Sequence, residues 1–223
     1  MRIINKAKKW GWNVISTVAI LFVFASAAPA QGYRPATAEQ QKEIMQNINA
    51  VSEQMKTLSC DFVQRKTISI LADEMVSEGK LSYSQPDKLR WEYIQPYQYR
   101  FTLNGSKVMV GSDENKNIID TNSSKIFKEI SKLIVMGING SGIFEENNFA
   151  AKFNIGGDDF QIALTPKQKE LKQIFSSITL TFNKADHTVN TVEIKEINGD
   201  ATFITMKNKQ INTELDNEIF VIR

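Results

Sequence analysis

The sequence predicts a mainly β (α+β) fold in which a curved antiparallel sheet forms an incomplete, open β-barrel closed by helices. Three observations support this prediction. From about residue 58 onward, most of the chain alternates apolar and polar residues with a period of two, as half-buried strands do. Two stretches have a helical period, and they do not alternate with strands as βαβ units would. Asn-Gly pairs between apolar runs indicate tight antiparallel hairpins.

The N-terminus has the composition of a secretory signal peptide. Four basic residues within 2–9 precede an apolar run over 14–25 and the small residues at 28–30. The apolar run is about a dozen residues long, short of the roughly 20 that a membrane-spanning helix needs. We therefore expect cleavage after Ala30. Gln31, rather than a lipid-accepting cysteine, follows that site, so the exported product is expected to be soluble.

Length and charge narrow the possibilities further. Without the leader, 31–223 has a length that suits one open-barrel domain with a sizeable core. The leader carries four of the 27 basic residues and no acidic ones, so the net charge changes from +2 to −2 on its removal. This balance argues against nucleic-acid binding, which needs a clustered basic face.

The first predicted helix spans about 38–56. Thr37 and Gln40 have the spacing of a capping box at its start. Five apolar residues then recur at spacings of four, three, four and three, which places them on one helical face. They are Ile44, Ile48, Val51, Met55 and Leu58. A helix with one apolar stripe is expected to lie against the sheet.

Strands follow this helix, each with bulky apolar groups on one side and polar groups on the other. The single cysteine, Cys60, falls on the apolar side of the first strand, so a buried and inert thiol is favoured over a reactive one. Asn104-Gly105 predicts a hairpin with a type I′ turn. Further strands are expected at 153–155, 160–164, 178–182, 191–195 and 202–206, with a turn of helix within 166–172.

The second helical stretch, 123–138, is more apolar than a surface helix needs to be, and glycines at 137, 140 and 142 end it. Two interpretations remain open. The segment is either an ordinary buried helix with a loose C-terminal loop or a movable lid over an apolar cavity.

No catalytic or metal-binding group is evident. His187 lies in a turn without a second ligand or partner acid, so we expect a solvated side chain. Ser141 is not part of a Gly-x-Ser-x-Gly elbow. The acidic pairs at 73–74, 145–146 and 158–159 are interpreted as solvated turns. We therefore expect no enzymatic activity, cofactor or metal.

One block is specific enough to carry a family resemblance. The run Gly79-Lys80-Leu81-Ser82-Tyr83-Ser84-Gln85-Pro86-Asp87-Lys88-Leu89-Arg90-Trp91-Glu92-Tyr93, preceded by Asp61-Phe62-Val63-Gln64, resembles the outer-membrane lipoprotein carrier (LolA-like) family. The hairpin at 103–108, the run 164–167 and the segment 198–220 follow at the corresponding places, so the resemblance spans about 38–222.

The resemblance implies a periplasmic chaperone that holds the acyl chains of lipoproteins in an apolar concave interior. It also implies passage of cargo from an inner-membrane ABC-type release complex to an acceptor at the outer membrane, by a protein expected to be monomeric. The expected cavity residues on the sheet are Leu81, Tyr83, Leu89, Trp91, Tyr93, Tyr99, Phe101 and Met109. The expected lid residues are Ile126, Phe127, Ile130, Leu133, Ile134 and Met136.

This sequence departs from the family at the residue before the proline of the block. Many members have a basic residue there, which can hold the lid shut, whereas this chain has Gln85. Gln85 remains a candidate latch without charge assistance, and Arg90 or Arg100 is a candidate substitute. We therefore expect the lid to open easily, with faster hydrogen exchange in 123–138 than in the strands.

Two other functions compete with the lipoprotein carrier. The same fold would suit a periplasmic binder of another acylated lipid or glycolipid, which co-purifying lipid would reveal. It would also suit a lipid-sensing regulatory module of the cell envelope, which would not transfer lipoprotein. A lipid hydrolase is disfavoured because no nucleophile is paired with a base.

Overall fold

The computed structural model describes residues 32–70, 73–112, 114–123, 125–140, 142–144 and 149–223, with the backbone alone for 125–127. The expected leader and its cleavage site lie outside the described residues. Gln31–Arg223 form one compact unit, to which every element below belongs. Within the described ranges, no helix is both long and apolar enough to cross a membrane.

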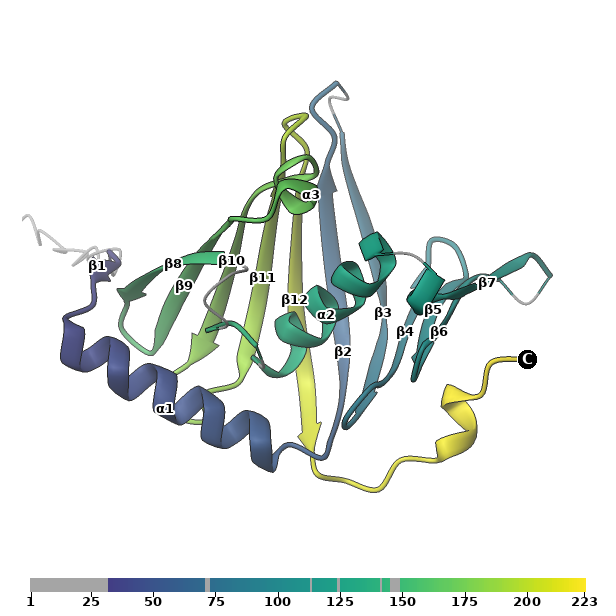
Figure 1. Ribbon diagram of the computed structural model, residues 1–223, viewed down its shortest axis with the longest axis horizontal. Helices are drawn as coiled ribbons and strands as arrows, with labels where there is room; N and C mark the ends of the chain where they lie inside the picture. Colours follow the sequence, from purple (N-terminus) through teal and green to yellow (C-terminus); the bar gives the residue numbers. More distant parts are fainter. Residues whose placement is uncertain (1–31, 71–72, 113, 124, 141, 145–148) are drawn as a thin grey trace, which may run out of the picture. The chain divides into compact units, whose positions relative to one another are not determined.

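Twelve antiparallel strands form one sheet in the order β1-β8-β9-β10-β11-β12-β2-β3-β4-β5-β6-β7 (Figure 1). Their bounds are β1 Arg34–Pro35, β2 Thr57–Thr67, β3 Glu74–Ser84, β4 Lys88–Gln95, β5 Tyr99–Asn104, β6 Lys107–Gly111, β7 Lys116–Asp120, β8 Phe149–Ile155, β9 Asp159–Pro166, β10 Phe175–Asn183, β11 Val189–Glu196 and β12 Ala201–Ile211. Among the described residues no ladder joins β1 to β7. The predicted open antiparallel architecture is therefore confirmed.

The helices are α1 (Ala38–Gln54), α2 (Lys125–Asn139) and the short α3 (Lys169–Lys172), with 3-10 turns η1 (Thr121–Ser123) and η2 (Asn217–Phe220). The predicted capping box of α1 is present. The Gln40 amide donates to Thr37 Oγ1 at 3.3 Å, and the Thr37 amide donates to Gln40 Oε1 at 3.0 Å. The first turn of α1 is thereby satisfied locally.

Bulky apolar side chains from most strands share the side of the sheet that faces α1 and α2, which we call the inner face. Directly opposed residues in antiparallel strands lie on the same face. The register pairs Cys60 with Leu81, Leu81 with Trp91, and Trp91 with Phe101, so the four share the inner face. Cys60 is buried as predicted, and burial raises the pKa of its thiol to about 12.

Helix α1 covers one end of the inner face, along the lower ends of β8 to β12 in Figure 1. The fully buried Ile48 lies against Gly140, beside Phe182. Phe182 stacks on Phe160 with ring centroids 5.1 Å apart. The prediction of a solvated His187 side chain is wrong. This side chain is half-buried, and its Nε2 lies 3.1 Å from Nδ2 of Asn47 on α1.

The β5–β6 hairpin is present, but its turn differs from the prediction. Asn104 pairs with Lys107 within the ladder, so the two-residue loop is Gly105-Ser106 rather than Asn104-Gly105. Gly105 has φ +59°, whereas Ser106 is not among the residues with positive φ. A type I′ turn needs positive φ at both central residues, so that turn type is excluded.

Candidate functional site: an apolar cavity beneath helix α2

Helix α2 lies in front of the middle of the sheet (Figure 1) and leaves a cavity of about 180 Å³ beneath it. From α2 the lining consists of Ile130, Leu133, Ile134 and Gly137. From the sheet it consists of Trp91, Phe175, Ile178, Val192, Ile194, Ile204 and Met206. None of the described lining residues is charged, so the cavity suits hydrocarbon and disfavours ions.

An aromatic cluster forms the β4 side of this cavity. Phe62 lies 5.0 Å from Trp91 and 5.2 Å from Tyr93, measured between ring centroids. Gly79 makes room for the Phe62 ring, since a Cβ there would lie 2.7 Å from it and 2.0 Å from the carbonyl oxygen of Glu92. Burial raises the pKa of Tyr93 to about 12. The first residue of the family-like block is therefore a glycine because a side chain there would clash with its neighbours.

The indole Nε1 of Trp91 is buried without a hydrogen-bond partner by distance and angle. Trp91 nevertheless interacts with Tyr93, since it is one of the side chains that act to lower the pKa of that phenol.

A second cavity, of about 450 Å³, lies along the opposite side of α2. It is bordered by polar residues such as Asp87, Thr121 and Ser131 as well as by Leu171 and Phe149. Leu133 lines both cavities. Helix α2 is thus the partition between the two spaces.

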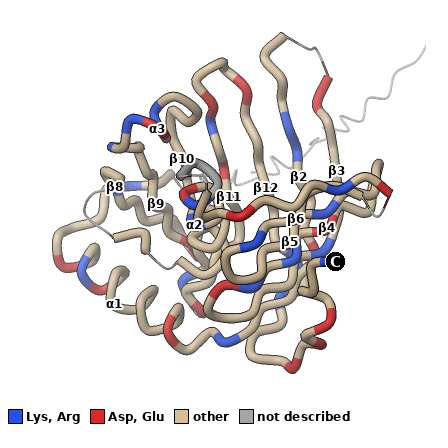
Figure 2. The backbone as a smooth tube through the Cα atoms, turned by 45° about the vertical axis from the view of Figure 1, so that its right-hand side comes forward, with Lys and Arg blue, Asp and Glu red and all other residues tan. Residues whose placement is uncertain are grey.

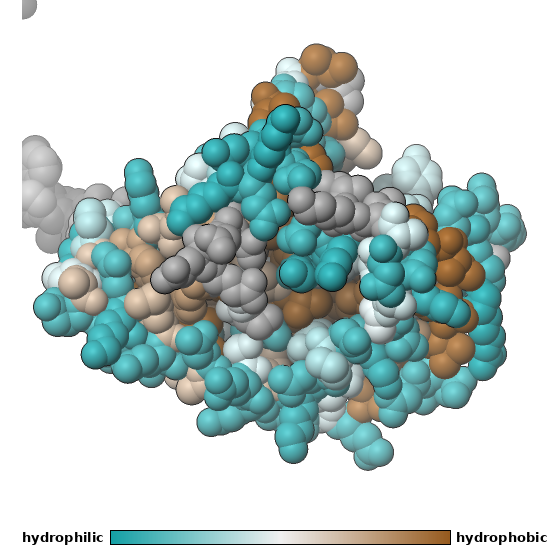
Figure 3. All heavy atoms as spheres, in the orientation of Figure 1, coloured by the Kyte–Doolittle hydropathy of each residue, from teal (hydrophilic) through white to brown (hydrophobic). Residues whose placement is uncertain are grey.

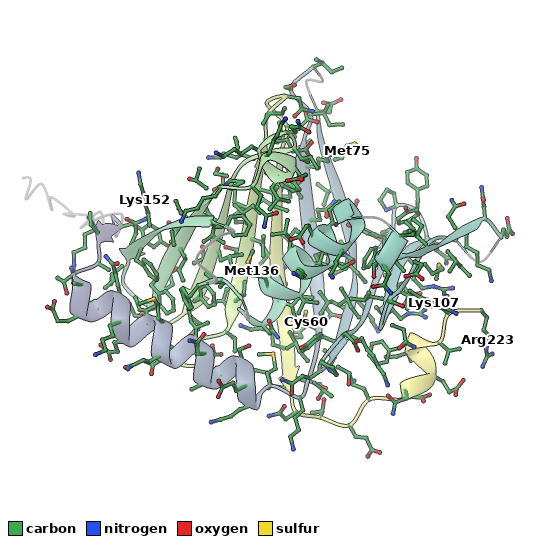
Figure 4. The ribbon with its side chains drawn as sticks, in the orientation of Figure 1. Cys60, Met75, Lys107, Met136, Lys152 and Arg223 are labelled. Atoms are coloured by element: carbon green, nitrogen blue, oxygen red, sulfur yellow. The ribbon has the colours of Figure 1, made fainter. Side chains whose placement is uncertain are left out.

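One hydrogen bond ties the C-terminal end of α2 to the sheet. Asn139 Nδ2 donates to the Tyr83 hydroxyl at 3.1 Å, and both residues are buried. Burial is the main reason that the pKa of Tyr83 is raised. This contact was not anticipated from the sequence. Figure 4 shows Met136, one turn earlier on α2, in front of the sheet.

The structure brings only part of the expected cavity together. Trp91, Ile130, Leu133 and Ile134 line it. Leu81, Tyr83, Leu89, Tyr93, Tyr99 and Phe101 share the inner face through their registers but lie outside the lining, and Met136 borders the second cavity. The side chains of Ile126 and Phe127 lie outside the described residues. The lining from β10 to β12 was not predicted, because alternation shows which side chains share a face and not which of them border a cavity.

Met109 is a correction, because it lies on the outer face. It pairs with Thr102, whereas its neighbour Val108 pairs with inner-face Leu103. Met109 is nevertheless buried, since the C-terminal segment covers this side: Met109 borders a pocket with Val221, and the neighbouring Phe220 is fully buried. An apolar residue there serves the docking of the chain's own tail rather than the cavity.

The contacts that the described residues show for Arg90 and Gln85 do not reach α2. Arg90 is a correction: it lies on the outer face, with Nη2 2.8 Å from Glu92 Oε1 and Nη1 donating to the Ile219 carbonyl at 3.2 Å. Arg100 pairs with Glu92 in the register and shares that face. Gln85 is exposed, and its backbone amide donates to the Lys56 carbonyl at 2.8 Å.

Within the described part of the chain, no group of His, Cys, Asp or Glu has the geometry to hold a metal ion. An open antiparallel sheet with an apolar cavity under an amphipathic helix has the geometry of proteins that hold hydrophobic groups. Comparison of the sequence gives the particular family. The chain belongs to the outer membrane lipoprotein carrier protein LolA family, whose model matches residues 53–223. Members of this family are periplasmic carriers rather than enzymes, and their cargo is lipoprotein.

Individual relatives agree with this assignment. An outer-membrane lipoprotein carrier protein of Chromohalobacter salexigens is 24% identical over 219 residues, which cover 96% of this chain and 92% of that protein. One from Ralstonia nicotianae is 22% identical, covering 82% and 85%. A solved complex of Pseudomonas aeruginosa MucA and MucB matches with a TM-score of 0.50 at 9% identity, covering 81% of this chain and 61% of that chain. That likeness concerns the fold alone.

Proposed function

We propose that this protein holds the acyl chains of lipoproteins in the cavity beneath α2 while it carries them from the inner to the outer membrane. The observation that supports this proposal is the hydrocarbon lining contributed by α2 and by strands β4, β10, β11 and β12. At about 0.8 kcal/mol per buried methylene, an acyl chain of roughly fifteen carbons resists transfer to water by on the order of 10 kcal/mol. A carrier must therefore replace the membrane with an apolar surface.

The cavity is too small for that cargo in the present conformation. A volume of about 180 Å³ is close to the ~150 Å³ of an engineered cavity that holds one benzene molecule. An acyl chain has more than twice as many carbons. Helix α2 must therefore move away from the sheet, and because Leu133 lines both cavities, this movement joins them. In this proposal α2 is a movable lid, which was one of the two interpretations of the apolar segment 123–138.

The remaining parts of the pathway belong to the same proposal. The leader is removed after Ala30, and residues 31–223 act in the periplasm as a monomer. An inner-membrane ABC-type complex loads the cargo, and an acceptor at the outer membrane receives it. The support for the leader is the order of basic, apolar and small residues within 2–30, and the support for the transport steps is the family to which the chain belongs.

The experiment is a release assay. The exported protein is incubated with membranes that carry a triacylated lipoprotein, the release complex and ATP, and the soluble fraction is tested for a one-to-one complex. Ile134→Glu, which places a charge in the cavity, is expected to abolish the complex. Ile118→Glu on β7 is the matched control, because that isoleucine is exposed. Circular dichroism must show that both variants are folded.

Failure has a specific meaning in this design. If the wild-type protein forms no complex while mass spectrometry finds a lipid in it, the passenger is another acylated molecule. If Ile134→Glu and Ile118→Glu carry cargo equally well, the cavity beneath α2 is not the binding site.

A further inference from the structure

Apolar side chains project into solvent at two hairpin tips. Ile70, at the β2–β3 tip, is 89% exposed, and Ile197, at the β11–β12 tip, is 61% exposed. Met75, on the β3 side of the first tip, is 48% exposed and is labelled on the upper projection in Figure 4. Figure 3 shows hydrophobic residues gathered on that projection. We call Ile70, Met75 and Ile197 the tip patch.

The two tips are fastened to each other by polar contacts. Ser69 Oγ donates to the Asn198 carbonyl at 3.0 Å, and the Ser69 amide donates to Asp200 Oδ1 at 2.9 Å. The backbone hydrogen bond from Ser69 lowers the pKa of the Asp200 carboxyl. The backbone of the tips is therefore held in place while its apolar side chains point away from the core.

The tip patch lies at the end of the sheet opposite α1. Strands β2, β3 and β12 have 11 residues each, longer than the other strands, and α1 lies by the start of β2 and the end of β12 (Figure 1). The Ile197 amide donates to the Ile174 carbonyl at 3.1 Å. The next residue, Phe175, lines the cavity beneath α2. The tip patch is thus joined to one border of that cavity.

Two ion pairs lie below the tips. Arg65 lies 3.0 Å from Glu74, and Lys66 lies 3.3 Å from Glu196. Figure 2 shows both signs of charge interspersed on these hairpins. Asp73, in the β2–β3 hairpin, is a further exposed carboxylate, so the tips carry no excess of basic groups that would attract an anionic partner over a distance. The occupant of the tip patch is expected to be neutral and apolar.

A bilayer suits this patch better than a protein. A stable protein interface buries about 800 Å² on each partner, which three side chains do not supply. A bilayer accepts apolar side chains one at a time and needs no matching shape. We propose that the tip patch inserts shallowly into an electrically neutral lipid surface and places the cavity beside it. The biological purpose of this membrane contact rests on the proposed carrier function, whereas the contact itself does not.

The test is vesicle sedimentation with the exported protein and phosphatidylcholine vesicles. The wild-type protein is expected to bind. Ile70→Ser/Ile197→Ser is expected to lose affinity by a factor of roughly ten or more. Binding should not weaken between about 0.1 M and 1 M salt, because screening affects charges and not apolar burial. Ile118→Ser, an exposed isoleucine on β7, is the matched control and should bind like wild type.

Three results would overturn the proposal: no binding by the wild-type protein, binding only to anionic vesicles with reversal by salt, or an equal loss in Ile118→Ser. The release assay separates this proposal from the carrier function. Ile70→Ser/Ile197→Ser should still hold cargo that has been loaded, whereas Ile134→Glu should lose cargo and still bind vesicles. Loss of cargo without loss of vesicle binding in the double variant would also contradict the assignment.

Discussion

Helices α1 and α2 cover the same face of one sheet, yet the space beneath them is filled differently. Near α1, Phe160 and Phe182 stack and are at most 2% exposed, and Ile48 is fully buried among their neighbours. Beneath α2, the apolar side chains of helix and sheet leave a cavity of about 180 Å³. A well-packed interior leaves few voids larger than a water molecule.

The two helices also differ in their polar contacts. The capping box of α1 is satisfied, Gln41 Nε2 donates to the Ala36 carbonyl at 3.0 Å, and Asn47 meets His187. At the end of α2, Asn139 binds Tyr83. In the proposed function, α1 belongs to the permanent core, whereas α2 exchanges its contacts with the sheet for contacts with cargo.

Thiol reactivity offers the largest expected contrast between the two regions. Cys60 is the single cysteine, and burial raises its pKa to about 12 from the ordinary 9.0. At pH 8 this shift alone lowers the thiolate fraction about 1,000-fold. We expect Ile134→Cys to provide a second thiol that reacts with a disulfide reagent faster than Cys60, because position 134 is only partly buried. Equal rates would contradict the distinction between a packed and an exchangeable region.

The same shift has a consequence for stability. The thiol has the higher pKa in the folded state, so its contribution is fully present below pH 9 and declines as the pH rises toward 12. The unfolded chain releases this proton first. We expect roughly 1 kcal/mol of lost stability at pH 10, which Cys60→Val should not show in denaturant titrations.

Truncation of one isoleucine in each helix compares the packing directly. Ile48→Ala is expected to cost about 2–5 kcal/mol of unfolding free energy, because a fully buried side chain leaves a void that its neighbours cannot fill. Ile134→Ala should cost less than about 1.5 kcal/mol, since one side of Ile134 already borders a cavity. Chemical denaturation measures both. A cost for Ile134→Ala equal to that for Ile48→Ala would show that α2 belongs to the permanent core.

Local sequence patterns predicted the elements of both regions well. The change of period after Leu58 marked the passage from helix to sheet, and the capping box at Thr37 marked the start of α1. Alternation also placed Leu81, Trp91 and Phe101 on one face. These features depend on residues that are near one another in the chain.

Features that depend on distant residues were not predictable in this way. The run Lys107–Val110 has apolar residues on both faces because the outer face is covered by a tail more than 100 residues later, so Met109 was assigned to the wrong side. The bond between Asn139 and Tyr83 joins residues 56 apart in sequence. The cavity is a space left between α2 and the sheet. Alternation of apolar and polar residues predicts which side chains share a face, but not how completely they fill such a space.

The hydrogen bond between Asn139 and Tyr83 is the next point at which to test the comparison. Asn139→Ala leaves a buried phenol without this donor, which should weaken the docking of α2 by about 1–3 kcal/mol. Hydrogen exchange should then speed up in α2 and stay unchanged in α1. Tyr83→Phe and the double variant complete a mutant cycle. A coupling energy near zero would show that this hydrogen bond does not hold α2 against the sheet.

The smallest expected effect concerns the start of α1. Thr37→Ala removes the oxygen that accepts the Gln40 amide, at an expected cost of about 1 kcal/mol of unfolding free energy. Exchange should accelerate only at the first turn of α1, because Ile48 and the rest of its apolar stripe keep their partners. Cargo binding in the release assay should be unchanged, in contrast to Asn139→Ala, whose looser α2 should load more readily. If Thr37→Ala altered loading instead, α1 would share the role of a lid, and the division between a permanent helix and an exchangeable one would be lost.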